Sequence, residues 1–111
     1  LQGDGEVNGT AIEISLTPTL QFIVHPGAGR SMRWPRAEDN ECHYVTAMST
    51  DLDEAMRGAA GQMLWFLQTH FDLSADDAYS LASVAIDLGV TQVVDGTLGC
   101  HAGIDRSILA G

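Results

Sequence analysis

The spacing of apolar residues changes along the chain, and this change constrains the fold more than any other feature. From residue 52 to residue 67, apolar side chains recur every three or four positions, the period of an amphipathic helix. Before this segment the apolar and polar residues alternate, as they do in half-buried strands. A second helical segment and two further strands follow. Strands, two antiparallel-type helices and a C-terminal strand pair, with no regular βαβ alternation, predict an α+β fold.

Two strands are expected at 10–16 and 19–25, separated at Thr17-Pro18 because proline cannot donate to a strand ladder. A short edge strand at 30–36, broken by Pro35, and a connection at 37–41 come next. A further strand is expected at 42–48, which is rich in β-branched and aromatic residues. The alternation predicts that the first two strands face inward through Ile12, Ile14, Leu16, Leu20, Phe22 and Val24.

The first helix is expected to be capped by Thr50 or Asp51, whose side chains can accept a hydrogen bond from the first turn. Gly58 and Gly61 each weaken this helix by roughly 1 kcal/mol relative to Ala. Both glycines are tolerable where a neighbouring backbone packs close to the helix.

The second helix is expected to begin at the cap Ser74 and to end near Leu88-Gly89, where glycine permits a left-handed C-terminal turn. Strands are predicted at 90–95 and 100–104. Asp105 is then expected to cap a last helical turn.

The charge of the chain excludes several kinds of partner. Fifteen acidic residues face five basic ones, which gives a formal net charge of -10. Such a chain repels phosphate backbones, so a nucleic-acid partner is excluded, and an anionic membrane surface is disfavoured. No apolar stretch approaches the ~18 residues of a membrane span, and no basic-then-apolar signal peptide is recognisable. A cytoplasmic location is expected.

An acidic segment flanked by glycine is the main candidate for chemistry. Asp4 and Glu6 stand two positions apart, with glycine on either side of Asp4. Glycine lets a backbone pass close to a ligand, and two carboxylates at this spacing can bind a hard cation or supply a general base. A solvated acidic loop explains the same residues. From the residues alone both interpretations stay open.

Two Cys-His dipeptides, Cys42-His43 and Cys100-His101, raise the question of a zinc site. Neighbours in a strand point to opposite faces, so one dipeptide cannot offer both side chains to one tetrahedral ion. Structural cysteines and histidines satisfied by hydrogen bonds are therefore favoured. Whether Cys42 and Cys100 form a disulfide stays open.

Other polar residues receive simpler interpretations. His25 lies at a predicted strand end before a Gly-rich loop, a place where side chains often face a cleft. His70 suits the end of the first helix, where positive charge complements the dipole, and is interpreted as structural. Asp87, Gln92 and Asp95 are expected to hydrogen-bond the backbone.

Four segments together resemble the acetamidase/formamidase family. The stretch 2–13, Gln-Gly-Asp-Gly-Glu-Val-Asn-Gly-Thr-Ala-Ile-Glu, is similar to a family stretch in which Cys often stands at the position of Asn8. The runs 43–46 and 51–56 are similar to the approach to the family's long helix. The run 78–96 resembles its C-terminal signature. The segments occur in the family's order over nearly the whole chain.

The resemblance implies that residues 1–111 are the C-terminal portion of a longer, β-rich enzyme, folded as a single α+β unit. The start of the chain without Met, directly in a segment dense in glycine and acid, agrees with this expectation. The remaining N-terminal part of the same protein is then an expected partner. The Met- and aromatic-rich helix also leads us to expect a homo-oligomer.

The resemblance further implies hydrolysis of a short linear amide, such as formamide or acetamide, with a divalent metal, zinc or calcium, at the site. Glu6 is the expected general base, Asp4 the metal ligand, and Gln2 the hydrogen-bond donor to the substrate oxygen. His25 is a further candidate. Two alternatives stay open: a non-catalytic assembly module of a larger protein, and a hydrolase of cyclic amides (lactams).

Overall fold

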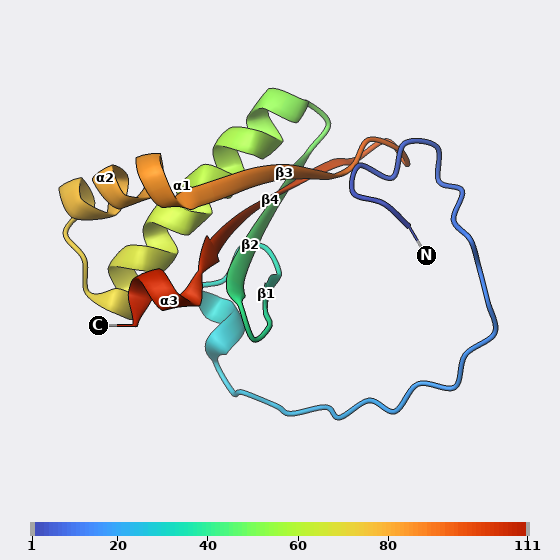
Figure 1. Ribbon diagram of the computed structural model, residues 1–111, viewed down its shortest axis with the longest axis horizontal. Coiled ribbons are helices and arrows are strands. Elements are labelled where there is room, and N and C mark those ends of the chain that lie inside the picture. The colour runs from blue at the N-terminus through green and yellow to red at the C-terminus, as the bar shows by residue number, and fades with distance from the viewer. Residues whose placement is uncertain (1, 111) are drawn as a thin grey trace.

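The computed structural model describes residues 2–110, which build a four-stranded antiparallel sheet with helices packed on it (Figure 1). The strand order is β1-β2-β4-β3, so the predicted α+β class is confirmed. The elements in chain order are the 3-10 helix η1 (Ala28–Arg30), β1 (Arg36–Glu38), β2 (Cys42–Ser49), α1 (Leu52–Phe71), α2 (Ala75–Ala85), β3 (Ile86–Gln92), β4 (Leu98–Asp105) and α3 (Arg106–Leu109).

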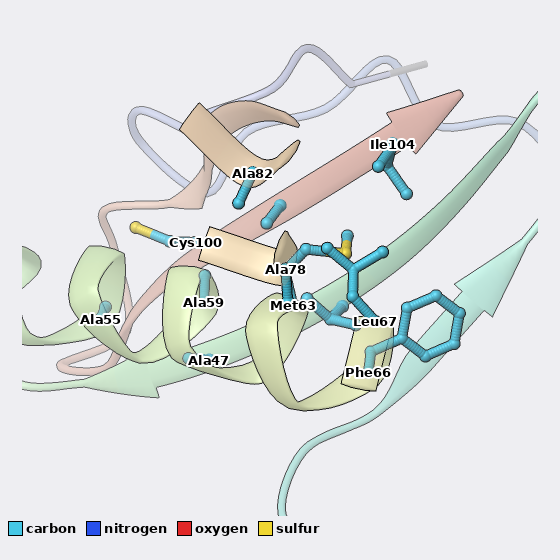
Figure 2. Packing of buried hydrophobic residues seen from close by; sticks show 12 residues of the cluster. Ala47, Ala55, Ala59, Met63, Phe66, Leu67, Ala78, Ala82, Cys100 and Ile104 are labelled. Atoms are coloured by element: carbon cyan, nitrogen blue, oxygen red, sulfur yellow. The ribbon is translucent and has the colours of Figure 1, made fainter. Parts of the chain in front are cut away.

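The core lies between the central strands β2 and β4 and the long helix α1, with α2 packed beside α1. Figure 2 shows small side chains meeting larger ones across this layer. The small residues let α1 approach the sheet closely, and Met63 and Leu67 fill the remaining space. The fully buried side chains come from alternate positions of the strands and one face of the helices: Val45, Ala47, Ala55, Ala59, Met63, Leu67, Ala78, Cys100, Ala102 and Ile104.

Local signals set both ends of α1. Asp51 is the N-cap, and its carboxylate accepts a hydrogen bond from the Glu54 backbone N–H at 2.9 Å. The helix ends at Asp72, which adopts the left-handed conformation with φ of 53°. Gly58 allows the predicted close packing, because a Cβ there would lie 2.8 Å from the Cβ of Ala47. Gly61 faces open space instead.

The second helix begins at its predicted cap, Ser74, but ends earlier than expected. It stops at Ala85, and Ile86 already pairs with Ile104 of β4. The predicted end at Leu88-Gly89 is therefore wrong, since these residues belong to β3. Pairing with β4 outweighs the local helical pattern, and Gly89 serves to leave room for the imidazole of His101.

The two strands predicted at 10–16 and 19–25 do not form among the described residues. Figure 1 shows this segment as an open arc that stands away from the sheet and helices. The side chains expected to face inward are all exposed: Ile12, Ile14, Leu16, Leu20, Phe22 and Val24. Within residues 2–110 no strand lies beside the segment, and a strand needs such a partner for its hydrogen bonds.

The edge strand is also shifted from its predicted place. It was expected at 30–36, whereas β1 covers Arg36–Glu38 and pairs with β2 through the register Ala37↔Tyr44. Part of the expected connection 37–41 is therefore strand. Pro35, which cannot donate to the ladder, stands immediately before β1. In the part of the chain that the structure describes, no helix is both long and apolar enough to span a bilayer.

Candidate functional site

The Gly-acid segment forms a tight turn that is fixed to the sheet. The backbone N–H of Glu6 donates to the carbonyl of Gly3 at 3.4 Å, and the N–H of Val93 donates to the carbonyl of Gly5 at 3.0 Å. Gly5 and Glu6 both have positive φ, 95° and 35°. Glycine adopts such angles without cost, whereas Glu6 pays roughly 1–2 kcal/mol of steric strain there. The turn therefore holds Glu6, half-buried, in a conformation that an ordinary loop would avoid.

The turn brings Asp4 to a histidine from the other end of the sequence. Oδ2 of Asp4 lies 3.6 Å from Nε2 of His101 on β4, with the carboxylate side chain 84% exposed and the imidazole 21% exposed. The other imidazole nitrogen, Nδ1, is buried and has no hydrogen-bond partner among residues 2–110. A polar atom in this state costs free energy unless something pairs with it, so His101 marks this place as a candidate site.

His101 lies on the sheet face opposite α1, since its neighbour Cys100 points into the core. The Tyr44 ring meets it edge-on, with ring centroids 6.1 Å apart. A cavity of about 380 Å³ opens beside the two rings. Its polar lining residues are Cys42, Tyr44, Asp87, His101 and Asp105.

Two pKa shifts describe the protonation states near this cavity. The side chain of Cys42, partial burial and the charge of Asp39 raise the pKa of Tyr44 to about 12, so the phenol keeps its proton at neutral pH. Burial raises the pKa of the Cys100 thiol on the opposite face. The two cysteines are free: Cys42 pairs with Asp105 in the sheet register and Cys100 with Ala47.

The predicted candidates are thus only partly brought together. Asp4 and Glu6 share one turn, Gln2 precedes it as an exposed residue, and His101 joins them. Sequence reasoning treated His101 as a satisfied structural histidine and so did not find it. The strand alternation, which places it on the face opposite Cys100, was the available signal.

His25 lies elsewhere, beside a cavity of about 430 Å³ that neither Asp4 nor Glu6 lines. His43 and His70 line the same cavity. Nδ1 of His43 is 3.2 Å from Oε2 of Glu38, and Nε2 of His70 is 3.1 Å from Nη1 of Arg36.

The structural interpretations of four further residues can be compared with the contacts. The His70 ring stacks on Phe66 with centroids 4.7 Å apart, in keeping with a structural role. Gln92 Nε2 donates to the carbonyl of Thr97 at 2.9 Å, which confirms a backbone hydrogen bond. Asp95 adopts a left-handed turn conformation with φ of 67°, and Asp87 lines the cavity beside His101.

The donor atoms at the turn indicate which kind of metal ion they would suit. Asp4 offers an oxygen and His101 a nitrogen, a pair that suits zinc better than calcium, which takes oxygen ligands. Within residues 2–110 no group of three or more His, Cys, Asp or Glu side chains is arranged to hold an ion. The described part of the chain therefore offers a pair of donors and not a complete coordination shell.

Comparisons with known proteins show which class of protein the chain resembles. No protein-family model matches the chain, and no curated protein matches it. Three solved structures that match it are described as an acetamidase or a predicted acetamidase/formamidase. One is the acetamidase from Bacillus halodurans, 25% identical, with a TM-score of 0.66 over 71% of this chain. Another is a predicted acetamidase/formamidase from Thermoanaerobacter tengcongensis, 25% identical, with a TM-score of 0.67 over 75% of this chain.

The third match extends over almost the whole chain. The acetamidase from Yersinia enterocolitica is 27% identical, with a TM-score of 0.78 over 99% of this chain. The resemblance to the acetamidase/formamidase family, predicted from the sequence, is thereby confirmed. The chain spans only 27%, 28% and 33% of the lengths of the three matched proteins.

Proposed function

We propose that this chain forms part of an amidohydrolase that cleaves the C–N bond of a short linear amide, such as formamide or acetamide, to a carboxylate and ammonia. The matches to proteins named as acetamidases, at 25% and 27% identity, support this proposal. The observation that carries it within the chain is the contact between Asp4 of the Gly-acid turn and His101. The imidazole of His101 also lines a cavity, which Asp4 and Glu6 do not line.

Glu6 is the proposed general base. An amide resists water because its carbonyl is resonance-stabilised and its amine is a poor leaving group. A carboxylate near the reacting water accepts its proton during attack and returns the proton to the departing nitrogen. The half-buried side chain and the constrained backbone of Glu6 favour a fixed position for this carboxylate. Gln2, at the start of the same turn, is the proposed donor to the substrate carbonyl oxygen.

Asp4 and His101 are the proposed ligands of a divalent metal. When bound, such an ion polarises a carbonyl and lowers the pKa of a coordinated water. The oxygen-nitrogen donor pair favours zinc, and the remaining ligands would come from polypeptide outside residues 2–110.

The test uses the full-length polypeptide that contains these residues and measures ammonia released from acetamide and formamide. The substitution Glu6→Gln keeps the size of the side chain and removes its basicity. We expect kcat to fall by about 10²- to 10⁴-fold, the usual contribution of a general base. Glu13→Gln, the same change in the exposed segment beyond the turn, is the matched control and should leave kcat unchanged.

Three results would contradict parts of the proposal. Near-normal kcat in Glu6→Gln removes Glu6 from the reaction. Cleavage of a lactam such as 2-pyrrolidone in preference to acetamide changes the substrate class. A polypeptide that binds no zinc or calcium when these ions are added, and that releases no ammonia from any of these amides in their presence, identifies an assembly module instead.

A further inference from the structure

Among residues 2–110, the longest run of exposed large apolar side chains lies on one extended segment, which we name the apolar arm (residues 13–24). Its large side chains are between 69% and 87% exposed at Ile14, Leu16, Leu20, Phe22 and Val24, with only Ile23 slightly less so at 66%. Scattered exposed apolar residues are ordinary in monomers, but a contiguous run of this kind marks an interaction site. Figure 1 shows the arm as an arc away from the body.

The backbone of the arm is also open to a partner. No hydrogen bond joins residues 13–24 to any other part of the described chain. An extended backbone with free N–H and C=O groups is what a sheet edge binds when a strand is added to it. The sequence alternates, with Ile14 and Leu16 on one face and Glu13 and Ser15 on the other. Such a strand would bury one face and leave the other in water.

We propose that the apolar arm adds as a β-strand to a sheet edge in acetamidase-type polypeptide that this chain does not itself contain. The match to the Yersinia enterocolitica protein covers 99% of this chain, so it includes the arm, but only 33% of that protein. The other two thirds of such a protein offer the partner surface. A second copy of this chain is a poorer partner, because each copy carries a formal charge of -10.

Residues 10–12 join the arm to the turn that carries Asp4 and Glu6. The turn is held at one end by the hydrogen bond from the Val93 N–H to the Gly5 carbonyl, whereas the chain beyond Gly9 leads through residues 10–12 into the arm. Docking of the arm fixes this second end. The choice of partner rests on the same comparisons as the proposed function, and the docking would then complete the positioning of the two carboxylates.

The experiment co-expresses this chain, carrying an affinity tag, with the two thirds of the Yersinia enterocolitica acetamidase that the match leaves uncovered. We expect the two polypeptides to purify together, and the amides of residues 13–24 to exchange with solvent at least about tenfold more slowly in the complex than in the chain alone. Ile14→Asp should reduce the recovered partner by about tenfold or more, because it buries a charge. Ser15→Asp, on the polar face, is the matched control and should not.

Other results overturn the inference. If no complex forms, or if a complex forms while residues 13–24 exchange as fast as before, the arm is not the docking strand. If the chain alone dimerises with a protected arm, the partner is a second copy. Protection of the arm in a complex that releases no ammonia from amides supports the docking and contradicts the proposed function. The experiment can therefore contradict the docking of the arm without contradicting the proposed amide hydrolysis, and the reverse.

Discussion

Nε2 of His101 lies 3.6 Å from Oδ2 of Asp4, so β4 near the end of the sequence holds the turn near its beginning. The carboxylate is 84% exposed, and an ion pair so open to water contributes little to stability. The imidazole Nδ1, by contrast, is buried and has no partner among the described residues, which opposes stability. The contact between Asp4 and His101 is therefore better explained as positioning the Asp4 carboxylate than as stabilising the fold.

This explanation predicts a small effect of Asp4→Asn on stability. Removing the charge should change the free energy of unfolding by less than about 1 kcal/mol, the range of exposed ion pairs. Urea denaturation followed by circular dichroism measures the change. In the full-length protein the same substitution should reduce amide hydrolysis. A loss of stability above about 2 kcal/mol, beyond what exposed pairs contribute, would instead assign the pair a structural role.

Two glycines in α1 should respond oppositely to the same substitution. At Gly61 a Cβ meets nothing within 4 Å, so Gly61→Ala should stabilise the protein by about 1 kcal/mol through helix propensity. At Gly58 a Cβ would lie 2.8 Å from the Cβ of Ala47, and overpacking costs about 1–3 kcal/mol. Gly58→Ala should therefore destabilise on balance. Parallel urea denaturations compare the two variants, and equal shifts in midpoint would contradict the close approach of α1 to β2.

The features predicted correctly from the sequence depend on neighbours in the chain. Asp51, Ser74 and Asp105 each cap a helix within a few residues of themselves, so local chemistry is sufficient to identify them. The end of α2 depends instead on the pairing of Ile86 with Ile104, which no local pattern records. The apolar spacing typical of a helix continues beyond Ala85, the residue at which α2 ends.

The apolar arm and the candidate site show the same limit. Alternation identifies which face of the arm is apolar, but not what covers that face, so Ile14 and Leu16 were expected in a core that does not reach them. The flanking glycines identified Asp4 and Glu6 as candidate functional residues. His101, which contacts Asp4, stands at the opposite end of the sequence, and only the β2-β4-β3 arrangement shows that contact.

Asp72 supplies a test of backbone conformation. It ends α1 with φ of 53° and ψ of 32°, where glycine is normally found. Asp72→Ala should be less stable than Asp72→Gly by about 1 kcal/mol, because a Cβ disfavours the left-handed region. Thermal or urea unfolding of the two variants measures the difference. The reverse order, with Ala more stable, would mean that the helix continues through this position.

Asp39 should make stability depend on pH. Its Oδ1 accepts the backbone N–H of Cys42 at 2.7 Å and of Glu41 at 2.8 Å, and these bonds hold its pKa below the ordinary value. A carboxylate with a lowered pKa in the folded state stabilises the protein above its unfolded pKa, and the effect is lost as pH falls through the folded pKa.

The variant Asp39→Ala isolates this contribution, since all other carboxylates are shared with the unsubstituted protein. The difference in free energy of unfolding between the two proteins should be constant from about pH 6 to 7 and should shrink below about pH 4, the range of an aspartate pKa. Urea denaturation across this range gives the profile, with Glu13→Gln in the exposed arm as control. A difference independent of pH would show that Asp39 acts through packing alone, because only the ionised carboxylate gains from accepting two backbone N–H groups.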